Sequence, residues 1–222
     1  MFRTALIAAA IAAPLSAQAF TVGAAYTFAG SQADLTGFTE LAPIPAGDPA
    51  FTDVGIASIT AAGAAGSEFY NPGPPFGAGR ALFNQPDGSL VVIDEGTSDS
   101  FGAGIFTIDF VERTTEFGLR LADTSQDFIT PQFSLFRDGA NFRSITFLGT
   151  YNAASRFSID DAGGFDRLVV SSASGTDGYG ITDLTVGATI PRPSSEIPVP
   201  AALPLLATGM AVLFGLRRRR AA

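Results

Sequence analysis

The chain has 222 residues, a formal net charge of −8, no histidine, no cysteine and, by inspection of the sequence, no lysine. Without these side chains it cannot build a Ser-His-Asp, Cys-His or Ser-Lys catalytic site, a Schiff base, an ordinary zinc site or a disulfide. An acidic chain also lacks the cationic surface that binds nucleic acid, so we expect no nucleic-acid partner.

The N-terminal residues 1–19 have the three parts of a secretory signal peptide. Arg3 supplies the positive start, residues 5–15 are apolar, and Ala17, Gln18 and Ala19 form an A-x-A cleavage site. We therefore predict cleavage after Ala19 and a mature chain that begins at Phe20. The alternative is an uncleaved anchor helix, for which the apolar run is short.

Residues 20–186 are predicted to form one exported domain, long enough to bury a core. Of the 13 arginines, Arg3 and Arg217 to Arg220 lie in the terminal segments, so that the domain and linker together, residues 20–196, hold 8 arginines against all 21 acidic residues, a net charge of −13. Such a surface favours solubility, and it suits cation-bridged contact with an anionic polysaccharide matrix.

The first third of this domain is irregular in pattern. Residues 54–60 and 90–93 are predicted strands, and residues 43–49 and 61–79 are predicted loops rich in Pro, Gly and Ala. Tyr70 lies in the longer loop and is the candidate exposed ring for binding a sugar. The chain has no tryptophan, which weakens a lectin interpretation.

Alternation of apolar and polar residues predicts five strands in the rest of the domain, each with one apolar face. The apolar sets are Phe106, Ile108 and Phe110; Phe117, Leu119 and Leu121; Phe133 and Leu135; Ile145 and Phe147; and Phe157 and Ile159. Turn residues between them include Glu112-Arg113-Thr114, Gly163-Gly164 and the hairpin signal Asp138-Gly139. This spacing predicts an all-β fold, an antiparallel sandwich.

The C-terminal end carries a linker and an apolar tail. Residues 187–196 are a predicted Pro/Ser linker. From Ala201 to Leu216 no residue is charged, and a helix of that length covers roughly 24 Å, or roughly 28 Å if it starts at Pro198. The arginines that follow keep to the cytoplasmic surface, so residues 197–222 are predicted to hold one transmembrane helix with the domain outside.

This tail resembles a known sorting signal. The motif residues Ile197, Pro198, Val199, Pro200 and Ala201, the apolar run, and the cluster Arg217, Arg218, Arg219 and Arg220 together resemble the VPLPA-CTERM signal of the PEP-CTERM group of bacterial surface proteins. Ile197 and Val199 are conservative departures from the family pattern. The resemblance implies recognition and removal of the tail by an exosortase, a membrane-embedded cysteine transpeptidase or protease.

A second resemblance covers residues 164–170 (GFDRLVV) and 179–187 (YGITDLTVG). These segments are similar to the closing strands of jelly-roll domains in other PEP-CTERM-type proteins, with Thr182 as an extra residue that we interpret as a bulge. The resemblance implies a jelly-roll-like β-sandwich.

Carboxylates are the remaining candidates for chemistry. Glu112 with Glu116, or Asp160 with Asp161, would be the acids of a glycosidase, although solvated turn residues are the simpler interpretation. A structural Ca²⁺ is the more plausible use of acidic loops, but none has EF-hand spacing. The Ca²⁺ candidates are Asp94, Glu95 and Asp99; Asp123 and Asp127; and Asp160, Asp161, Asp177 and Asp183.

These observations favour a non-enzymatic, exported bacterial surface protein with a structural or matrix-associated role and no cofactor. Its expected partners are an exosortase, the membrane and exopolysaccharide. The alternatives are a carbohydrate-binding module, assisted by Ca²⁺, and a carboxylate glycosidase.

Overall fold

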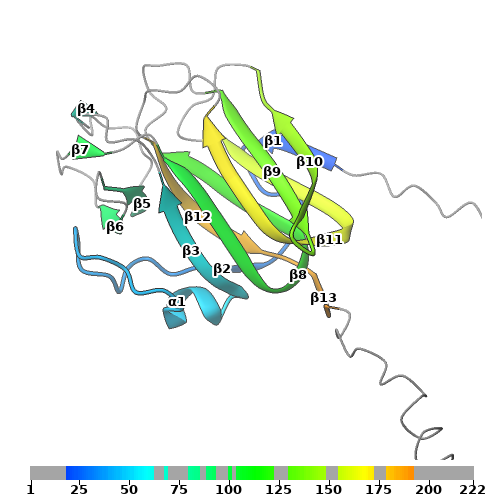
Figure 1. Ribbon diagram of the computed structural model, residues 1–222, viewed down its shortest axis with the longest axis horizontal. Coiled ribbons are helices and arrows are strands. Elements are labelled where there is room, and N and C mark those ends of the chain that lie inside the picture. Colours follow the sequence, from blue (N-terminus) through cyan, green and yellow to red (C-terminus); the bar gives the residue numbers. More distant parts are fainter. Residues whose placement is uncertain are drawn as a thin grey trace, which may run out of the picture. The chain divides into compact units, whose positions relative to one another are not determined.

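The structure, a computed structural model, describes residues 19–62, 68–69, 80–85, 89–93, 100–101, 104–122, 130–148, 155–172 and 179–192. These residues form an antiparallel β structure, as the all-β prediction requires (Figure 1). Their single helix, α1 (Pro49–Thr52), is four residues long. It begins with Pro49 at its first turn and with the Asp48 carboxylate accepting the Ala50 N–H at 2.9 Å, which is a normal N-cap.

The strands are listed in chain order. They are β1 (Ala19–Gly23), β2 (Ser31–Gln32), β3 (Ile56–Ala62), β4 (Glu68–Phe69), β5 (Ala81–Asn84), β6 (Leu90–Ile93), β7 (Ser100–Phe101), β8 (Ile105–Ala122), β9 (Pro131–Arg137), β10 (Ala140–Thr146), β11 (Arg156–Ser172), β12 (Gly180–Val186) and β13 (Thr189–Ile190). The central path of the sheet is β10-β9-β11-β8-β12-β5-β6, and β4 pairs separately with β7.

The long strands β8 and β11 each pair with different partners along their length. Residues 105–110 of β8 pair with β3 and with residues 167–170 of β11, which continue to β9 and β10. Residues 117–122 of β8 pair with β12 and with residues 156–159 of β11, which continue to β1. The two strands therefore connect two groups of partners (Figure 1).

Two predicted turns are wrong. Glu112-Arg113-Thr114 lies inside the continuous strand β8, and Gly163-Gly164 lies inside β11. Gly164 has a φ of 68° and the β8–β11 register shifts at this point, so the glycines form a bulge that changes the course of the strand without ending it. The polar residues of β8 stay in the sheet because β13 pairs with Thr114 and Arg113.

The predicted alternation is confirmed by burial. Phe106, Ile108 and Phe110 are at most 1% exposed, as are the apolar residues of the second set and those of β9 and β11. Ile145 and Phe147 follow the predicted phase but are only half-buried, because β10 is the outermost strand on its side of the sheet path.

Local turn chemistry also fits the structure. Asp138 and Gly139 join β9 to β10 with φ angles of 52° and 79°, as a two-residue hairpin turn with two positive angles requires. The strand predicted at residues 90–93 is β6. The strand predicted at residues 54–60 begins later, at Ile56, because α1 and its turn precede it.

The largest buried side chains of the core are aromatic rings, most of them from β8, β9 and β11. Phe110 packs edge-on against Phe117 at 5.2 Å and against Phe165 at 5.5 Å between ring centroids. Phe133 and Phe157, 5.2 Å apart, form a second group with Phe147. The same buried cluster includes residues from both groups of strands.

The described residues include only part of the predicted linker and of the predicted signal peptide. Residues 189–190, inside the predicted linker, form β13 with β8. No helix within the described residues is long and apolar enough to cross a membrane. Residues 1–18, most of the predicted signal peptide, and the predicted transmembrane segment within residues 197–222 lie outside the described part.

Candidate functional site

One face of the β8–β11 pair carries a ladder of polar residues. Reading along it, Arg120 is opposite Arg156, Gly118 is opposite Ser158, and Glu116 is opposite Asp160. The residues between them, such as Phe117 and Phe157, point into the core on the other face. The outer face therefore has arginines at one end and carboxylates at the other.

Residues 24–30, between β1 and β2, lie across this ladder. The Thr27 N–H donates to Ser158 Oγ at 3.3 Å, and Arg156 Nη1 donates to the Ala24 carbonyl at 2.8 Å. The Tyr26 ring sits directly over Gly118, where a Cβ atom would lie 2.5 Å from the ring carbons. Glycine at position 118 thus allows Tyr26 to lie flat against the sheet.

Both the ring and the hydroxyl group of Tyr26 make specific contacts. Its ring stacks with Phe28 at 5.8 Å, and its hydroxyl donates to the Asp183 carbonyl at 2.6 Å. Burial raises the pKa of Tyr26 well above its ordinary value, and the nearby Asp183 carboxylate raises it further. The phenol therefore stays protonated and remains a hydrogen-bond donor at neutral pH.

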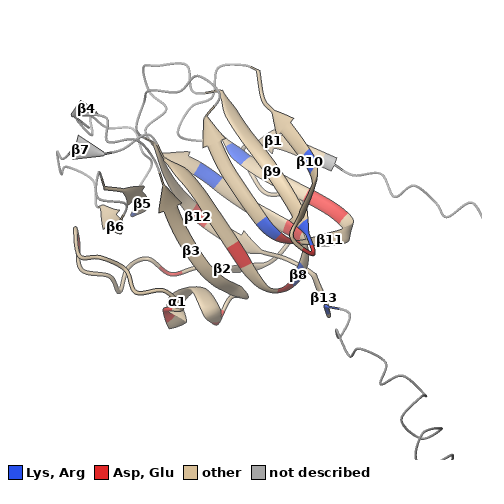
Figure 2. Ribbon diagram, in the orientation of Figure 1, with Lys and Arg blue, Asp and Glu red and all other residues tan. Residues whose placement is uncertain are grey.

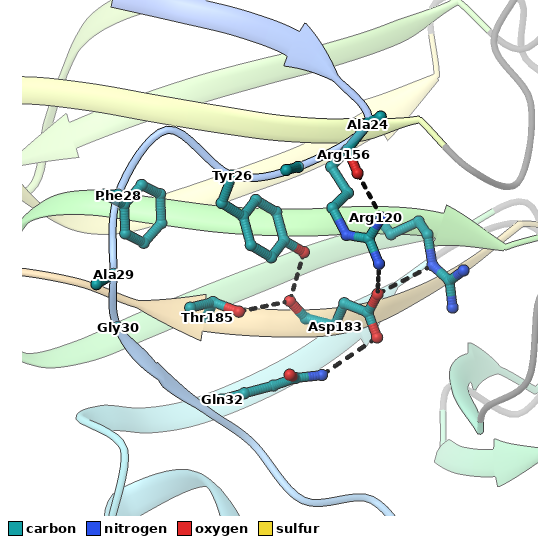
Figure 3. Close-up of a pocket in the computed structure, with 11 residues that line it drawn as sticks. Ala24, Tyr26, Phe28, Ala29, Gly30, Gln32, Arg120, Arg156, Asp183 and Thr185 are labelled. Atoms are coloured by element: carbon teal, nitrogen blue, oxygen red, sulfur yellow. Dashed lines mark hydrogen bonds and ion pairs between the residues drawn. The ribbon is translucent and has the colours of Figure 1, made fainter.

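Asp183 is the centre of the polar contacts (Figure 3). Its Oδ2 lies 3.2 Å from Arg120 Nε and 3.3 Å from Arg156 Nη2, and its Oδ1 accepts from Gln32 Nε2 at 3.2 Å. Its φ of 53° is unusual for a residue other than glycine, and the β12 register shifts between Thr182 and Thr185. The bulge that the sequence predicted near Thr182 is confirmed, and it turns Asp183 toward the arginines.

These side chains surround an open hollow of about 700 Å³ (Figure 3). Its walls are Tyr26, Phe28 and the small residues of the segment 24–30, together with Gln32, Thr185 and the Asp183–arginine group. The hollow offers guanidinium and amide donors beside two aromatic rings, which are the groups that bind sugars or carboxylates. Among the lining residues Asp183 is the only carboxylate, and a glycosidase requires two.

The carboxylates proposed for catalysis are used in local contacts. Glu112 Oε2 accepts from Thr189 Oγ1 at 3.1 Å, and Glu116 Oε2 accepts from the Ala188 N–H at 3.0 Å. Asp161 is fully buried and pairs with Arg137 at 2.9 Å. Asp160 lies beside Glu116, away from the hollow's arginines.

The Ca²⁺ candidates are not brought together where the structure describes them. Asp161 and Asp183 contact different arginines, which compete with a metal cation for their oxygens. The candidates Asp94, Glu95, Asp99, Asp123, Asp127 and Asp177 lie outside the described residues. Within the described part, no group of three His, Cys, Asp or Glu residues is placed to hold a metal ion.

The remaining predicted sites also lie outside the described residues. They are Tyr70, Ala17, the motif residues 197–201 and the arginines 217–220. Ala19, the last residue of the predicted signal peptide, is the first residue of β1.

Comparison with protein-family models, curated proteins and solved structures finds no match for this chain.

The sequence did not predict the hollow. Arg120 and Arg156 occupy polar positions of predicted strands, which was visible, but only the folded register places them opposite each other. Tyr26 and Gln32 come from the other end of the domain, so no local pattern links them to Asp183.

Proposed function

We propose that this chain is an exported, membrane-sorted bacterial surface protein with a non-enzymatic, structural or matrix-associated role. The observation that carries the proposal is the C-terminal tail, in which a proline motif, an apolar span and four arginines follow one another in the order of the VPLPA-CTERM signal. The N-terminal signal peptide agrees with it, because export is the step that must come first. An exosortase is the partner that the tail implies.

The exported domain is proposed to be a jelly-roll-like β-sandwich. The support is that β8 and β11 pair with one group of strands along one part and with another group along the other part. In β-sandwiches, a strand can pass from one sheet to the other at a bulge, where it changes its pairing partners. Phe110 and Phe117, which lie in the two differently paired parts of β8, contact each other within the core, as facing layers do.

The sorting proposal is tested by changing Arg217 to Arg220 to serine in the full-length chain. Without these charges nothing holds the end of the helix on the cytoplasmic side, so we expect the protein to lose membrane arrest and tail processing. Fractionation and mass measurement of the exported product follow both steps. As a control, Arg192→Ser changes an arginine before the span and should leave processing unchanged. Normal processing of the four-serine variant would contradict the proposal.

Carbohydrate binding is the second candidate function, and the hollow favours it. The site presents aromatic rings, an amide and guanidinium groups together on an open surface. Arg156 contributes directly, because its side chain is 31% exposed while its guanidinium reaches both Ala24 and Asp183. Such a guanidinium binds carboxylate or hydroxyl oxygens of an acidic sugar well.

This candidate is tested by equilibrium binding to alginate, a uronate polymer, with neutral dextran as the comparison. We expect Arg156→Ala to weaken alginate binding by about tenfold, the loss of one charge-assisted contact. Arg167→Ala removes an arginine from another part of the sheet and should bind as the parent does. Equal binding by all three proteins would reject the hollow as the sugar site, and a repeat with chelator tests whether Ca²⁺ assists.

A further inference from the structure

Two carboxylates face each other across the β8–β11 pair with no cation between them. Asp160 and Glu116 are directly opposite, an arrangement that is unfavourable for like charges. Burial raises the pKa of Asp160, and the charges of Glu116 and Asp161 raise it further. Among the described residues no arginine forms an ion pair with Asp160, and the neighbouring Asp161 is paired with Arg137.

The other neighbour of Asp160 is the first strand of the domain. In the β1–β11 register Ala19 is opposite Asp160, and Phe20 is opposite Ile159. The peptide bond between Ala19 and Phe20, the predicted cleavage site, thus lies opposite residues 159–160 of the neighbouring strand β11. The side chain of Phe20 is fixed by its contact with Phe147 at 6.1 Å.

We infer that cleavage after Ala19 places the new α-ammonium group of Phe20 beside Asp160, where it supplies the missing positive charge. This inference rests on the proposed export and signal-peptide removal. Hydrolysis breaks the bond between the Ala19 carbonyl carbon and the Phe20 nitrogen. Water gives its hydroxyl to that carbon and a proton to the nitrogen, and the amine takes its third proton from the new Ala19 carboxylic acid.

The charges around the new N-terminus define how strong this ion pair is. Glu116, opposite Asp160, adds a further negative charge, and the charge of the buried Asp161 is offset by Arg137, while the Arg143 guanidinium, 5.2 Å from the Phe20 ring centroid, opposes the ion pair. Asp160 lies on β11, which pairs with β1, and Glu116 lies on β8, on the other side of β11. Removing the signal peptide therefore does more than release the chain, because it stabilises the pairing of β1 with β11.

The composition of the chain allows the α-amino group to be labelled selectively. Because the chain has no lysine, the α-amino group of the mature protein is its only primary amine. An amine-acylating reagent therefore reports on this group alone, and its reaction rate as a function of pH gives the α-amino pKa. A carboxylate within about 4–6 Å raises that pKa above its ordinary value of about 7.7–8.0.

The protein for the test is the chain from Phe20 to Ala222 in detergent, released from a fusion so that Phe20 is its first residue. At pH 7 we expect the acylation rate of Asp160→Asn to exceed that of the parent by about three- to tenfold, because the parent amine holds its proton more tightly. Asp53→Asn removes an exposed carboxylate elsewhere and should react as the parent does. Equal rates for the parent and Asp160→Asn would overturn the inference.

A stability measurement checks the same contact independently. The folded α-ammonium has a raised pKa, so its stabilising effect is complete below the unfolded value of about 7.7–8.0 and is lost as the pH rises through the folded value. Acetylation should therefore lower the Tm of the parent at pH 6.5 but leave the Tm of Asp160→Asn unchanged. Equal losses in both proteins would also overturn the inference.

A separate measurement distinguishes failure of the proposed processing from failure of the proposed contact. N-terminal sequencing of the protein exported by cells tests whether cleavage occurs after Ala19, whereas the acylation experiment tests the contact in a chain that begins at Phe20 in any case. A different natural start would reject the processing, and the contact would then be a property of the cut chain only.

Discussion

Replacing Phe110 with alanine is expected to lower the free energy of unfolding by about 3–5 kcal/mol, the usual cost of removing a buried phenylalanine ring. Phe110 is 1% exposed and packs edge-on against both Phe117 and Phe165. These rings come from the two differently paired parts of β8 and from the bulge of β11. The loss therefore falls where the two groups of strands meet.

Denaturant unfolding of the parent and the variant measures this change, and for a domain of this size the Tm should fall by roughly 10 °C. Val111 is the matched control, because it is the next residue of the same strand but is 52% exposed. Val111→Ala should change stability by less than about 0.5 kcal/mol. Similar effects of the two substitutions would mean that Phe110 is not part of the core.

Replacing Arg137 with alanine is expected to destabilise the domain by about 3–5 kcal/mol, because it leaves a buried carboxylate without its cation. Asp161 is fully buried and contacts Arg137 Nη2 at 2.9 Å. Arg137 also donates from Nε to the Gly164 carbonyl at 2.7 Å and stacks over Phe142. The arginine thus ties the β9–β10 hairpin to the bulge of β11.

Two further variants separate charge from packing in this prediction. Adding Asp161→Asn to Arg137→Ala should recover part of the lost stability, because a neutral amide does not require a cation. Arg167→Ala breaks an ion pair with Asp109 at 2.6 Å whose members are 45% and 29% exposed, and should cost less than about 1 kcal/mol. A double variant no more stable than Arg137→Ala would exclude the buried charge as the cause.

Much of the strand pattern follows from local sequence. Phe106, Ile108 and Phe110 are buried as their alternation predicts, because one face of an antiparallel strand meets the core. The hairpin at Asp138-Gly139 is equally local, since both residues tolerate positive φ. These features depend on neighbouring residues only, so a single sequence is enough to find them.

The continuity of β8 could not be predicted in the same way. Residues 112–114 look like a turn, yet the Thr115 N–H donates to the Ala188 carbonyl at 2.8 Å and Thr114 pairs with Thr189. The partner that keeps this segment extended lies more than 70 positions away in the sequence. Tertiary pairing therefore overrides the local turn preference.

The candidate site also could not be predicted from local sequence, because its residues are far apart in the chain. The hydrogen bond from Tyr26 to Asp183 joins residues separated by 157 positions, and Arg120 comes from the middle of the chain. Tyr70 is the candidate that the sequence indicates, because a Gly-rich loop predicts an exposed ring. Burial of Tyr26 against a glycine is visible only after folding.

The position of β1 has a consequence for the order of events. Its first residue, Ala19, carries the carbonyl of the predicted scissile bond and is already paired with β11 in the folded domain. A protease needs its target backbone free and extended, and backbone paired in a sheet is protected from it. The proposed cleavage would therefore have to occur while β1 is not yet paired with β11, so that β1 docks only after the signal peptide is removed.

This order of events can be tested by measuring the rate at which the precursor is cleaved. A precursor that folds before it meets the peptidase would be cut slowly, at the rate at which β1 detaches from β11. Among the described strands β1 pairs only with β11, through the five residues Ala19 to Gly23, so this detachment is a local event and not unfolding of the whole domain.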